Sequence, residues 1–357
     1  MKQSPRFSFR GVLALAVLAS GLTLPQAHAA DWVDTNGNAF NGDPAGLLGP
    51  LALLKSGRAR GQRLPLANLK PEDALRYDQG LRELPARAKR WADGKSQITK
   101  ELRGSVRRIK DGTLTDTDLN DRMEPELLLV FFVESGGDAR EIFRAAIPLY
   151  NGLQAKYGDD FEMLFVGVNH TMGEHISLAE SLQMPWLVMK KNRQSRLDEI
   201  AMFAPDPAPG YALLSREGVP ITKASGIITS DVDKIFQQLE GLLVAMVPNN
   251  PRTWMQRVAY YKNVRLAEFA QGSGDPYLVG PPLLDKALAQ IGVTAFELTA
   301  EVDENGRATS VVVEPGPGIP DKYLTAVAKA FGPVPFVPAV KNGQFVPGTL
   351  HYRYSSH

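Results

Sequence analysis

Acidic and amide side chains near the start of the sequence have the spacing of a calcium-binding loop. Asp34, Asn36 and Asn38 occupy positions one, three and five of the template whose oxygen atoms bind Ca²⁺. That template requires glycine at position six and glutamate at position twelve, where this chain has Ala39 and Ala45. We therefore interpret the three side chains as turn or cap residues. The same interpretation holds for a second set that departs from the template in the same way: Asp116, Asp118 and Asn120.

Two histidines are the other candidate metal ligands. His170 and His175 are five residues apart, which on a helix separates their directions by about 140°. Neither a cysteine nor an H-E-x-x-H motif accompanies them. The sequence therefore predicts no metal site and no cofactor, and it favours two exposed residues in a loop or at a helix start.

Nucleophilic chemistry is restricted because the chain contains no cysteine. Without a thiolate, thiol exchange, disulfides and thiolate metal sites are excluded. Ser135 does not lie in a G-x-S-x-G elbow, and the sequence has no glycine-rich phosphate loop. We predict that the protein is not an enzyme. An enzyme whose site is assembled across domains stays open as an alternative.

Two apolar runs of strand length surround a helical pattern in the centre of the chain. The runs are 126–132 and 161–168, and apolar residues recur at helical spacing over 139–157. Strands that are apolar on both faces are typical of a parallel sheet covered by helices, so a βαβ unit is predicted. A hairpin over 211–222 and an amphipathic helix over 232–246 follow.

This order of elements is that of the thioredoxin fold, and the segment resembles its tryparedoxin and nucleoredoxin branch. The resemblance rests on F-F at 131–132, on L-Y-N-G-L-Q-A-K-Y-G-D-D-F-E-M-L-F-V-G-V at 149–168 and on M-P-W-L at 184–187. It covers roughly 100 residues. The resemblance implies a thioredoxin-like α/β domain whose active-site loop follows the first strand.

The loop itself departs from the family. Where the family has W-C-x-x-C-R, this chain has S-G-G-D-A-R, which places Ser135, Gly136, Gly137 and Asp138 in the active-site loop. The resemblance also implies a cis bond before Pro209, although an ordinary trans proline entering a strand is the alternative. A groove without redox chemistry could still bind a peptide.

The N-terminal segment contains closely spaced turn signals, which favour short strands and no long helix over 31–77. Its W-x-D-x-x-G-x-x-F pattern beginning at Trp32 and its P-L-x-x-L-x-x-E-D pattern beginning at Pro65 resemble the first homology domain of the yeast actin-patch protein Sla. The resemblance implies a small SH3-like barrel. The basic segment that follows is interpreted as a solvated linker helix, and a patch for anionic surfaces is the alternative.

The last 75 residues predict a hairpin, a helix and further strands. Their V-D-x-x-G pattern at 302–306 and their F-x-P-A-x-x-N-G pattern at 336–343 resemble the C-terminal domain of TonB energy transducers. In such domains an open sheet edge recruits a partner strand. The edge expected here consists of six residues: Thr349, Leu350, His351, Tyr352, Arg353 and Tyr354.

The first 29 residues have the layout of a secretory signal peptide. Lys2, Arg6 and Arg10 precede an uncharged stretch over 11–24, and an A-H-A cleavage site ends at Ala29. We expect cleavage there, because the apolar run is shorter than the roughly 20 residues of a spanning helix. A retained anchor is the alternative. Removing the leader takes away three of 40 basic residues and none of 39 acidic ones, and this balance does not indicate nucleic-acid binding.

The predicted fold class is α+β multidomain. The expected order is a signal peptide (1–29), an SH3-like β-barrel (30–80), a basic helical linker (81–122), a degenerate thioredoxin-like domain (123–248), a helical linker (249–274) and a TonB-like domain (275–357). We predict an exported, non-catalytic binding or scaffold protein of the bacterial envelope, in the periplasm or secreted, with protein or peptide partners and no membrane span after leader removal. A TonB-like energy transducer is the alternative of a different class.

Overall fold

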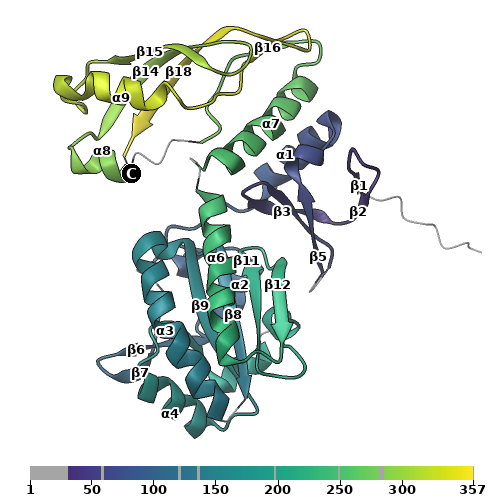
Figure 1. Ribbon diagram of the computed structural model, residues 1–357, viewed down its shortest axis with the longest axis vertical. Helices are drawn as coiled ribbons and strands as arrows, with labels where there is room; N and C mark the ends of the chain where they lie inside the picture. The colour runs from purple at the N-terminus through teal and green to yellow at the C-terminus, as the bar shows by residue number, and fades with distance from the viewer. Residues whose placement is uncertain are drawn as a thin grey trace, which may run out of the picture.

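The computed structural model describes residues 31–57, 60–119, 122–134, 137–196, 198–247, 250–280 and 285–356. The predicted leader, Ser135 and Gly136 lie outside these ranges. Within the ranges, no helix is both long and apolar enough to cross a bilayer. Figure 1 shows three bodies: a central α/β domain, an N-terminal β module beside helix α7, and a C-terminal domain beyond α7.

Seven strands form the central sheet in the order β12-β11-β8-β9-β10-β6-β7. β8, β9 and β10 are parallel, whereas β11 is antiparallel to β8 and to β12. The predicted βαβ unit is confirmed, since β8 and β9 are parallel neighbours joined by α3, and the order β9-β8-β11-β12 is the thioredoxin arrangement. The elements are β8 (Leu127–Glu134), α3 (Gly137–Tyr157), β9 (Phe161–Val168), α4 (Met172–Leu182), β10 (Leu187–Met189), α5 (Asp198–Ala201), β11 (Gly210–Ser215), β12 (Pro220–Ser225) and α6 (Val232–Met246).

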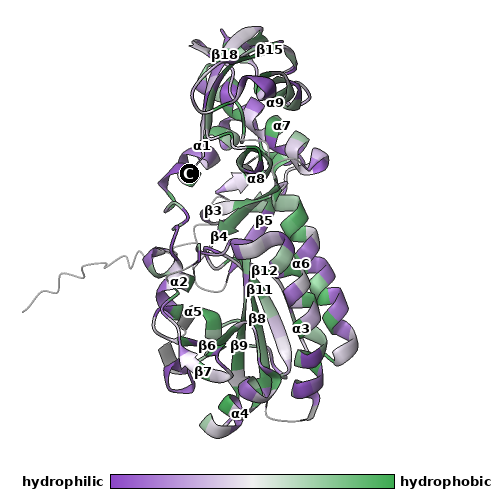
Figure 2. Ribbon diagram, turned by 90° about the vertical axis from the view of Figure 1, so that its left-hand side faces the viewer, coloured by the Kyte–Doolittle hydropathy of each residue, from purple (hydrophilic) through white to green (hydrophobic). Residues whose placement is uncertain are grey.

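Helices cover both faces of this sheet (Figure 2). Helices α3, α4 and α6 pack on one face, and α2 (Gln97–Leu102) and α5 pack on the other. Successive side chains of a strand point to opposite faces, so the apolar run of β8 serves both cores. Leu129, Phe131 and Val133 belong to the first core, and Leu128, Val130 and Phe132 belong to the second.

The segment 81–122 is not a helical linker, which corrects the sequence prediction. After a short 3₁₀ turn and α2 it contributes β6 (Val106–Lys110) and β7 (Thr113–Asp116) to the central sheet, where β6 pairs with β10. Basic side chains on β6 hid the strand signal, because their charge masks the apolar alternation. Arg107 pairs with Asp116 across the two strands at 2.9 Å.

The N-terminal module forms no closed barrel among its described residues. Its strands make an open three-stranded sheet and a separate two-stranded pair: β1 (Trp32–Val33), β2 (Ala39–Phe40), β3 (Asp43–Leu48), β4 (Leu51–Lys55) and β5 (Gly61–Pro65). The expectation of no long helix over 31–77 is wrong, because α1 (Pro71–Glu83) begins inside that range. Proline at the first helical position, followed by Glu72 and Asp73, favours a helix start there.

Helix α7 (Pro251–Glu268) is not a linker either, which corrects the second linker prediction. Its Tyr260 and Val264 are buried in one core with Trp32, Leu54 and Tyr77 of the N-terminal module. The Tyr260 hydroxyl donates to the carbonyl oxygen of Ala74 on α1 at 3.3 Å. The apolar face of α1 is thus covered by a helix that follows the central domain in the sequence.

The C-terminal domain has the predicted order of hairpin, helix and strands. β14 lies between β15 and β18 in an antiparallel sheet, and a second small sheet has the order β13-β16-β17. The elements are β13 (Ser273–Gly274), α8 (Asp285–Gln290), β14 (Ala295–Val302), β15 (Ala308–Glu314), α9 (Leu324–Phe331), β16 (Ala339–Lys341), β17 (Gln344–Val346) and β18 (Gly348–Ser355). The TonB-like and Sla-like assignments remain predictions.

Candidate functional site

A cavity of about 1020 Å³ lies between the N-terminal module and the central domain. On the central domain it meets the start of β8, the end of β11 and the C-terminal ends of α3 and α6, and on the other side it meets β3, β4 and the segment after α1. The start of β8 is the end of the sheet opposite to the degenerate active-site loop. The cavity is therefore separate from the place where the thioredoxin fold carries its chemistry.

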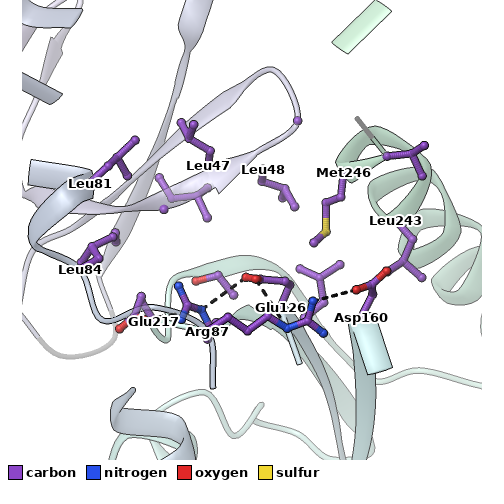
Figure 3. Close-up of a pocket in the computed structure, with 18 of the residues that line it drawn as sticks. Leu47, Leu48, Leu81, Leu84, Arg87, Glu126, Asp160, Glu217, Leu243 and Met246 are labelled. Atoms are coloured by element: carbon purple, nitrogen blue, oxygen red, sulfur yellow. Dashed lines mark hydrogen bonds and ion pairs between the residues drawn. The ribbon is translucent and has the colours of Figure 1, made fainter. Parts of the chain in front are cut away.

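One wall of the cavity is apolar. Figure 3 shows leucines of the N-terminal module facing the C-terminal turns of α6 across the opening. The wall consists of Leu47, Leu48, Leu81, Leu84, Leu243 and Met246. Apolar surface that lines a concave site favours ligands with apolar parts, because their transfer from water is favourable.

The opposite wall carries charged side chains that bind one another. Arg87 donates through Nη1 to Asp160 Oδ1 at 2.9 Å, and its Nε lies 3.8 Å from Glu126 Oε1 (Figure 3). Arg216 Nε lies 3.4 Å from Glu126 Oε2 and 3.8 Å from Glu217 Oε1. Burial raises the pKa of Glu126 and that of Glu217, and Arg216 opposes the shift in both cases.

Direct contacts fix the two sides of the cavity relative to each other. Lys55 donates to the carbonyl oxygen of Glu217 at 2.7 Å, and Arg216 Nη1 donates to that of Pro85 at 3.0 Å. Gly49, which has a φ of +54°, approaches α6 so closely that an added Cβ would lie 2.7 Å from the carbonyl oxygen of Ala245. Only glycine tolerates both this φ and this approach. The β3–β4 turn therefore closes directly onto the end of α6.

Arg257 on α7 is the cavity-lining cation without a partner in the described part of the chain. Its Nε is inaccessible to solvent and makes no hydrogen bond. Burial lowers the pKa of Arg257, and only Tyr261 acts against this shift. The position was not identified from the sequence, because 249–274 was interpreted as a linker.

The predicted active-site loop lies at the other end of the sheet. Gly137 and Asp138 form the first turn of α3, and Ser135 and Gly136 are outside the described residues. The Ala208–Pro209 peptide is cis, as the resemblance implied. Because Gly210 pairs with Phe132, Pro209 lies next to the carboxyl end of β8 and so beside the start of α3. Pro209 is thus at the same end of the sheet as the start of α3.

His170 and His175 are buried, which corrects the expectation of exposed residues. They are 5% and 2% exposed, and their rings meet edge to face with centroids 5.9 Å apart. His175 stacks on Phe165 at 4.5 Å, and its Nε2 lies 2.7 Å from the carbonyl oxygen of Met189. The sequence missed this burial because both residues lie after the apolar run of β9, where α4 folds back over the sheet.

The calcium-loop spacing has a structural explanation. Asp34 Oδ1 accepts from the backbone N–H groups of Asn36 at 2.9 Å and Asn38 at 2.8 Å, which makes it a turn residue as predicted. The side-chain amide of Asn38, which donates to Asp34 Oδ2 at 2.9 Å, lowers the pKa of Asp34 most, and the two backbone hydrogen bonds lower it further. Across the described ranges, no cluster of three or more histidine, cysteine, aspartate or glutamate residues is arranged to hold a metal ion.

The predicted strand edge is an outer strand of its sheet. β18 pairs with β14 on one side, and no strand of the described ranges pairs with its other side. Leu350 and Tyr354 are buried in the domain core, whereas His351 and Arg353 are exposed. Thr349 and Tyr352 complete the six predicted residues, and the hydroxyl of Thr349 donates to Glu301 at 3.0 Å.

Comparisons with solved structures give likenesses of low sequence identity and low TM-score, which cover between 34% and 42% of this chain. No protein-family model matches the chain, and no curated protein matches it. A putative thiol:disulfide interchange protein DsbE from Chlorobium tepidum is 20% identical with a TM-score of 0.28, over 34% of this chain and 82% of that one. A thiol:disulfide interchange protein from Bacteroides sp. is 14% identical with a TM-score of 0.30, over 42% and 91%. Peroxiredoxin Q of Xanthomonas campestris is 14% identical with a TM-score of 0.27, over 36% and 87%.

Unlike a thioredoxin-fold enzyme that depends on thiols, this chain has no cysteine at any position. The strand order β9-β8-β11-β12 and the crossover helix α3 are those of the thioredoxin fold. The attacking thiolate of thiol exchange is therefore missing from a scaffold that otherwise keeps the arrangement around Pro209. The chain contains a thioredoxin-like domain without cysteines.

Proposed function

We propose that this chain is an exported, non-catalytic binding protein of the bacterial envelope, and that its main ligand site is the cavity between the N-terminal module and the central domain. The observation that carries the proposal is the cavity itself, whose volume of about 1020 Å³ is at the upper end of small-molecule sites. Two bodies build it jointly, and direct contacts hold them together. The absence of cysteine supports a redox-inactive central domain.

The side chains of the cavity favour binding over catalysis. Raised pKa values of Glu126 and Glu217 are typical of catalytic acids, but ion-pair networks also produce them. Both carboxylates lie against Arg216. The serine of the cavity lining, Ser215, accepts a hydrogen bond from the backbone N–H of Val219 at 3.0 Å and is bonded to neither carboxylate. No pair of nucleophile and base is thus formed by the described residues of the cavity.

The proposal is tested with the fluorescent apolar probe 1-anilinonaphthalene-8-sulfonate. The folded chain should bind it saturably at one site, and Leu84→Trp should weaken that binding, because the larger indole occupies part of the cavity beside the apolar wall. Met255→Trp is the matched control, because Met255 is 58% exposed on α7 and is outside the cavity. An absence of saturable binding by the folded wild-type chain, or equal binding by the Leu84→Trp variant, contradicts the proposal.

Export rests on the predicted leader, which lies outside the described residues. If the leader is cleaved, the mass of the protein isolated from the envelope fraction should correspond to a chain beginning at Ala30. A retained leader would instead support an anchored protein and would favour the energy-transducer alternative.

A second binding function is favoured by the outer position of β18. An open edge presents unpaired N–H and C=O groups that an extended partner peptide can pair with. Deleting 349–357 is not a usable test, because it would remove the buried Leu350 and Tyr354. Amide hydrogen exchange gives a better one: alternate amides of β18 should exchange rapidly in the isolated chain. Uniform protection along β18 would show that a dimer mate or another segment closes the edge.

A further inference from the structure

The unmatched charge of Arg257 distinguishes it from the other cations of the cavity. Arg87 and Arg216 are matched by Asp160, Glu126 and Glu217, as described above. Lys156, at the margin, lies 2.7 Å from Glu240. A partly buried guanidinium without an anion is unfavourable, since it loses hydration without gaining a hydrogen-bonded partner. Arg257 has no such partner among the described residues.

The surroundings of Arg257 indicate which chemical group of a ligand would pair with its charge. Arg257 forms no ion pair with a carboxylate of the described residues, and its Nε makes no hydrogen bond, so the acidic wall does not serve as its counter-ion. A guanidinium binds carboxylate and phosphate oxygens through two parallel hydrogen bonds. A single oxyanion at Arg257 would therefore satisfy the one unmatched charge without disturbing the network around Arg216.

The remaining surface of the cavity constrains the rest of the ligand. The apolar wall consists of leucine and methionine side chains from β3, α1, the segment after it and α6. The charges of the polar wall are paired with one another, through Arg87 with Asp160 and through Arg216 with Glu126 and Glu217, whereas Arg216 Nε and Glu217 Oε1 make no hydrogen bond. A ligand that is polar over its whole length would leave the leucine wall without an apolar partner. An alkyl chain matches the leucine wall.

We infer that the cavity takes an amphiphile with one alkyl chain and one terminal oxyanion, with Arg257 holding the oxyanion and the leucine wall holding the chain. This inference rests on the proposed function, because it assigns a ligand class to the same cavity. The oxyanion is a carboxylate or a phosphate monoester, since a guanidinium accommodates both. Each added methylene that reaches the apolar wall should raise affinity by up to about fourfold.

The test is isothermal titration calorimetry on the full chain with four twelve-carbon probes below their micellar concentrations. The anions are dodecanoate and dodecyl phosphate, and the matched controls are dodecanol and dodecyltrimethylammonium. We expect at least one anion to bind about tenfold or more tightly than either control, because a charge-assisted hydrogen bond contributes that much. The anion that binds more tightly identifies the headgroup.

Variants of α7 assign the effect to one residue. Arg257→Met should remove the preference for the anions, Arg257→Lys should retain part of it, and Arg252→Met should not change it, since Arg252 is exposed at the start of the same helix. Arg257→Met removes a partly buried unpaired charge, so thermal unfolding at or above the wild-type temperature is expected. Anion preference that survives Arg257→Met overturns the inference.

The failure of this inference differs from that of the proposed function. If dodecanol and 1-anilinonaphthalene-8-sulfonate bind but the anions show no preference over dodecanol, the cavity is a binding site and the role of Arg257 is refuted. If none of the probes binds the folded chain, the cavity is not a ligand site and both proposals are overturned.

Discussion

Acidification should destabilise the central domain through His175. Its ring is buried against Phe165 and makes its one hydrogen bond through Nε2, to the carbonyl oxygen of Met189. Because a carbonyl oxygen accepts, Nε2 carries the proton in the neutral ring, and the buried Nδ1 faces Gly167 without a partner. Burial lowers the pKa of His175 from 6.5 to about 4. Protonation would place an N–H without an acceptor inside the fold.

The sign and size of the effect follow from linkage between proton binding and folding. Above pH 6.5 the ring is neutral in the folded and the unfolded chain, so it contributes no pH dependence. Between pH 6.5 and pH 4 the unfolded chain binds a proton that the folded chain does not bind, so the free energy of unfolding falls as the pH falls. With the two pKa values of His175, the decrease is about 2 kcal/mol at pH 5 and about 3 kcal/mol at pH 4.

Urea unfolding of the wild-type chain and of His175→Gln at pH 7 and pH 5 measures this contribution. Glutamine keeps an N–H for Met189 but does not titrate, so the wild-type chain should lose about 2 kcal/mol more than the variant. Glu126 and Glu217 have raised pKa values, which favour the folded state on acidification. Both residues are present in the wild type and in the variant, so their contribution cancels when the two chains are compared. His351→Gln removes an exposed histidine and is the control. Equal pH dependence of wild type and His175→Gln would refute the reasoning.

Three further outcomes are expected. Gly167→Ala should destabilise the central domain by roughly 1–3 kcal/mol in urea unfolding, because its Cβ would lie 2.4 Å from His175 Nδ1; an unchanged midpoint would show that the ring can move. Glu162, which is 1% exposed, accepts from the Tyr150 hydroxyl at 2.7 Å and from Arg122 at 2.8 Å. Glu162→Ala should cost about 3–5 kcal/mol and Tyr150→Phe about 1.5–3 kcal/mol, so wild-type stability of both variants would contradict a structural network. The purified chain should not accelerate the reduction of insulin disulfides by dithiothreitol, and any thiol-dependent turnover would contradict a redox-inactive domain.

Apolar periodicity was sufficient to predict the βαβ unit of the central domain. The runs over 126–132 and 161–168 are buried on both faces, and such strands have an apolar signal that no charge interrupts. The same criterion failed for β6, where Arg107 and Arg108 lie on a strand near the sheet margin. Such a strand joins the sheet through its backbone hydrogen bonds, while its charged side chains reach solvent or ion-pair partners. Its residues therefore show no apolar pattern in the sequence.

The candidate cavity could not be predicted from the sequence, for a different reason. Leu47, Leu84 and Leu243 are far apart in the chain, and each has an ordinary structural interpretation in its own segment. Their convergence depends on close approaches such as that of Gly49 to α6. The loop at 135–138 could be named only because a resemblance supplied it, and the structure has the cis Ala208–Pro209 peptide that the same resemblance implied.

The packing of α7 against α1 makes the N-terminal module discontinuous along the chain. Two of the ten buried residues of its core, Tyr260 and Val264, are synthesised after the entire central domain, which lies between the two parts in the sequence. A chain that emerges N-terminus first can complete the central domain from contiguous residues, while Trp32 and Tyr77 still lack their covering helix. Folding of the central domain then brings α1 and α7 together and reduces the entropy lost when they meet. The docking of α7 is therefore also the step that delivers Arg257 to the cavity and completes the proposed binding site.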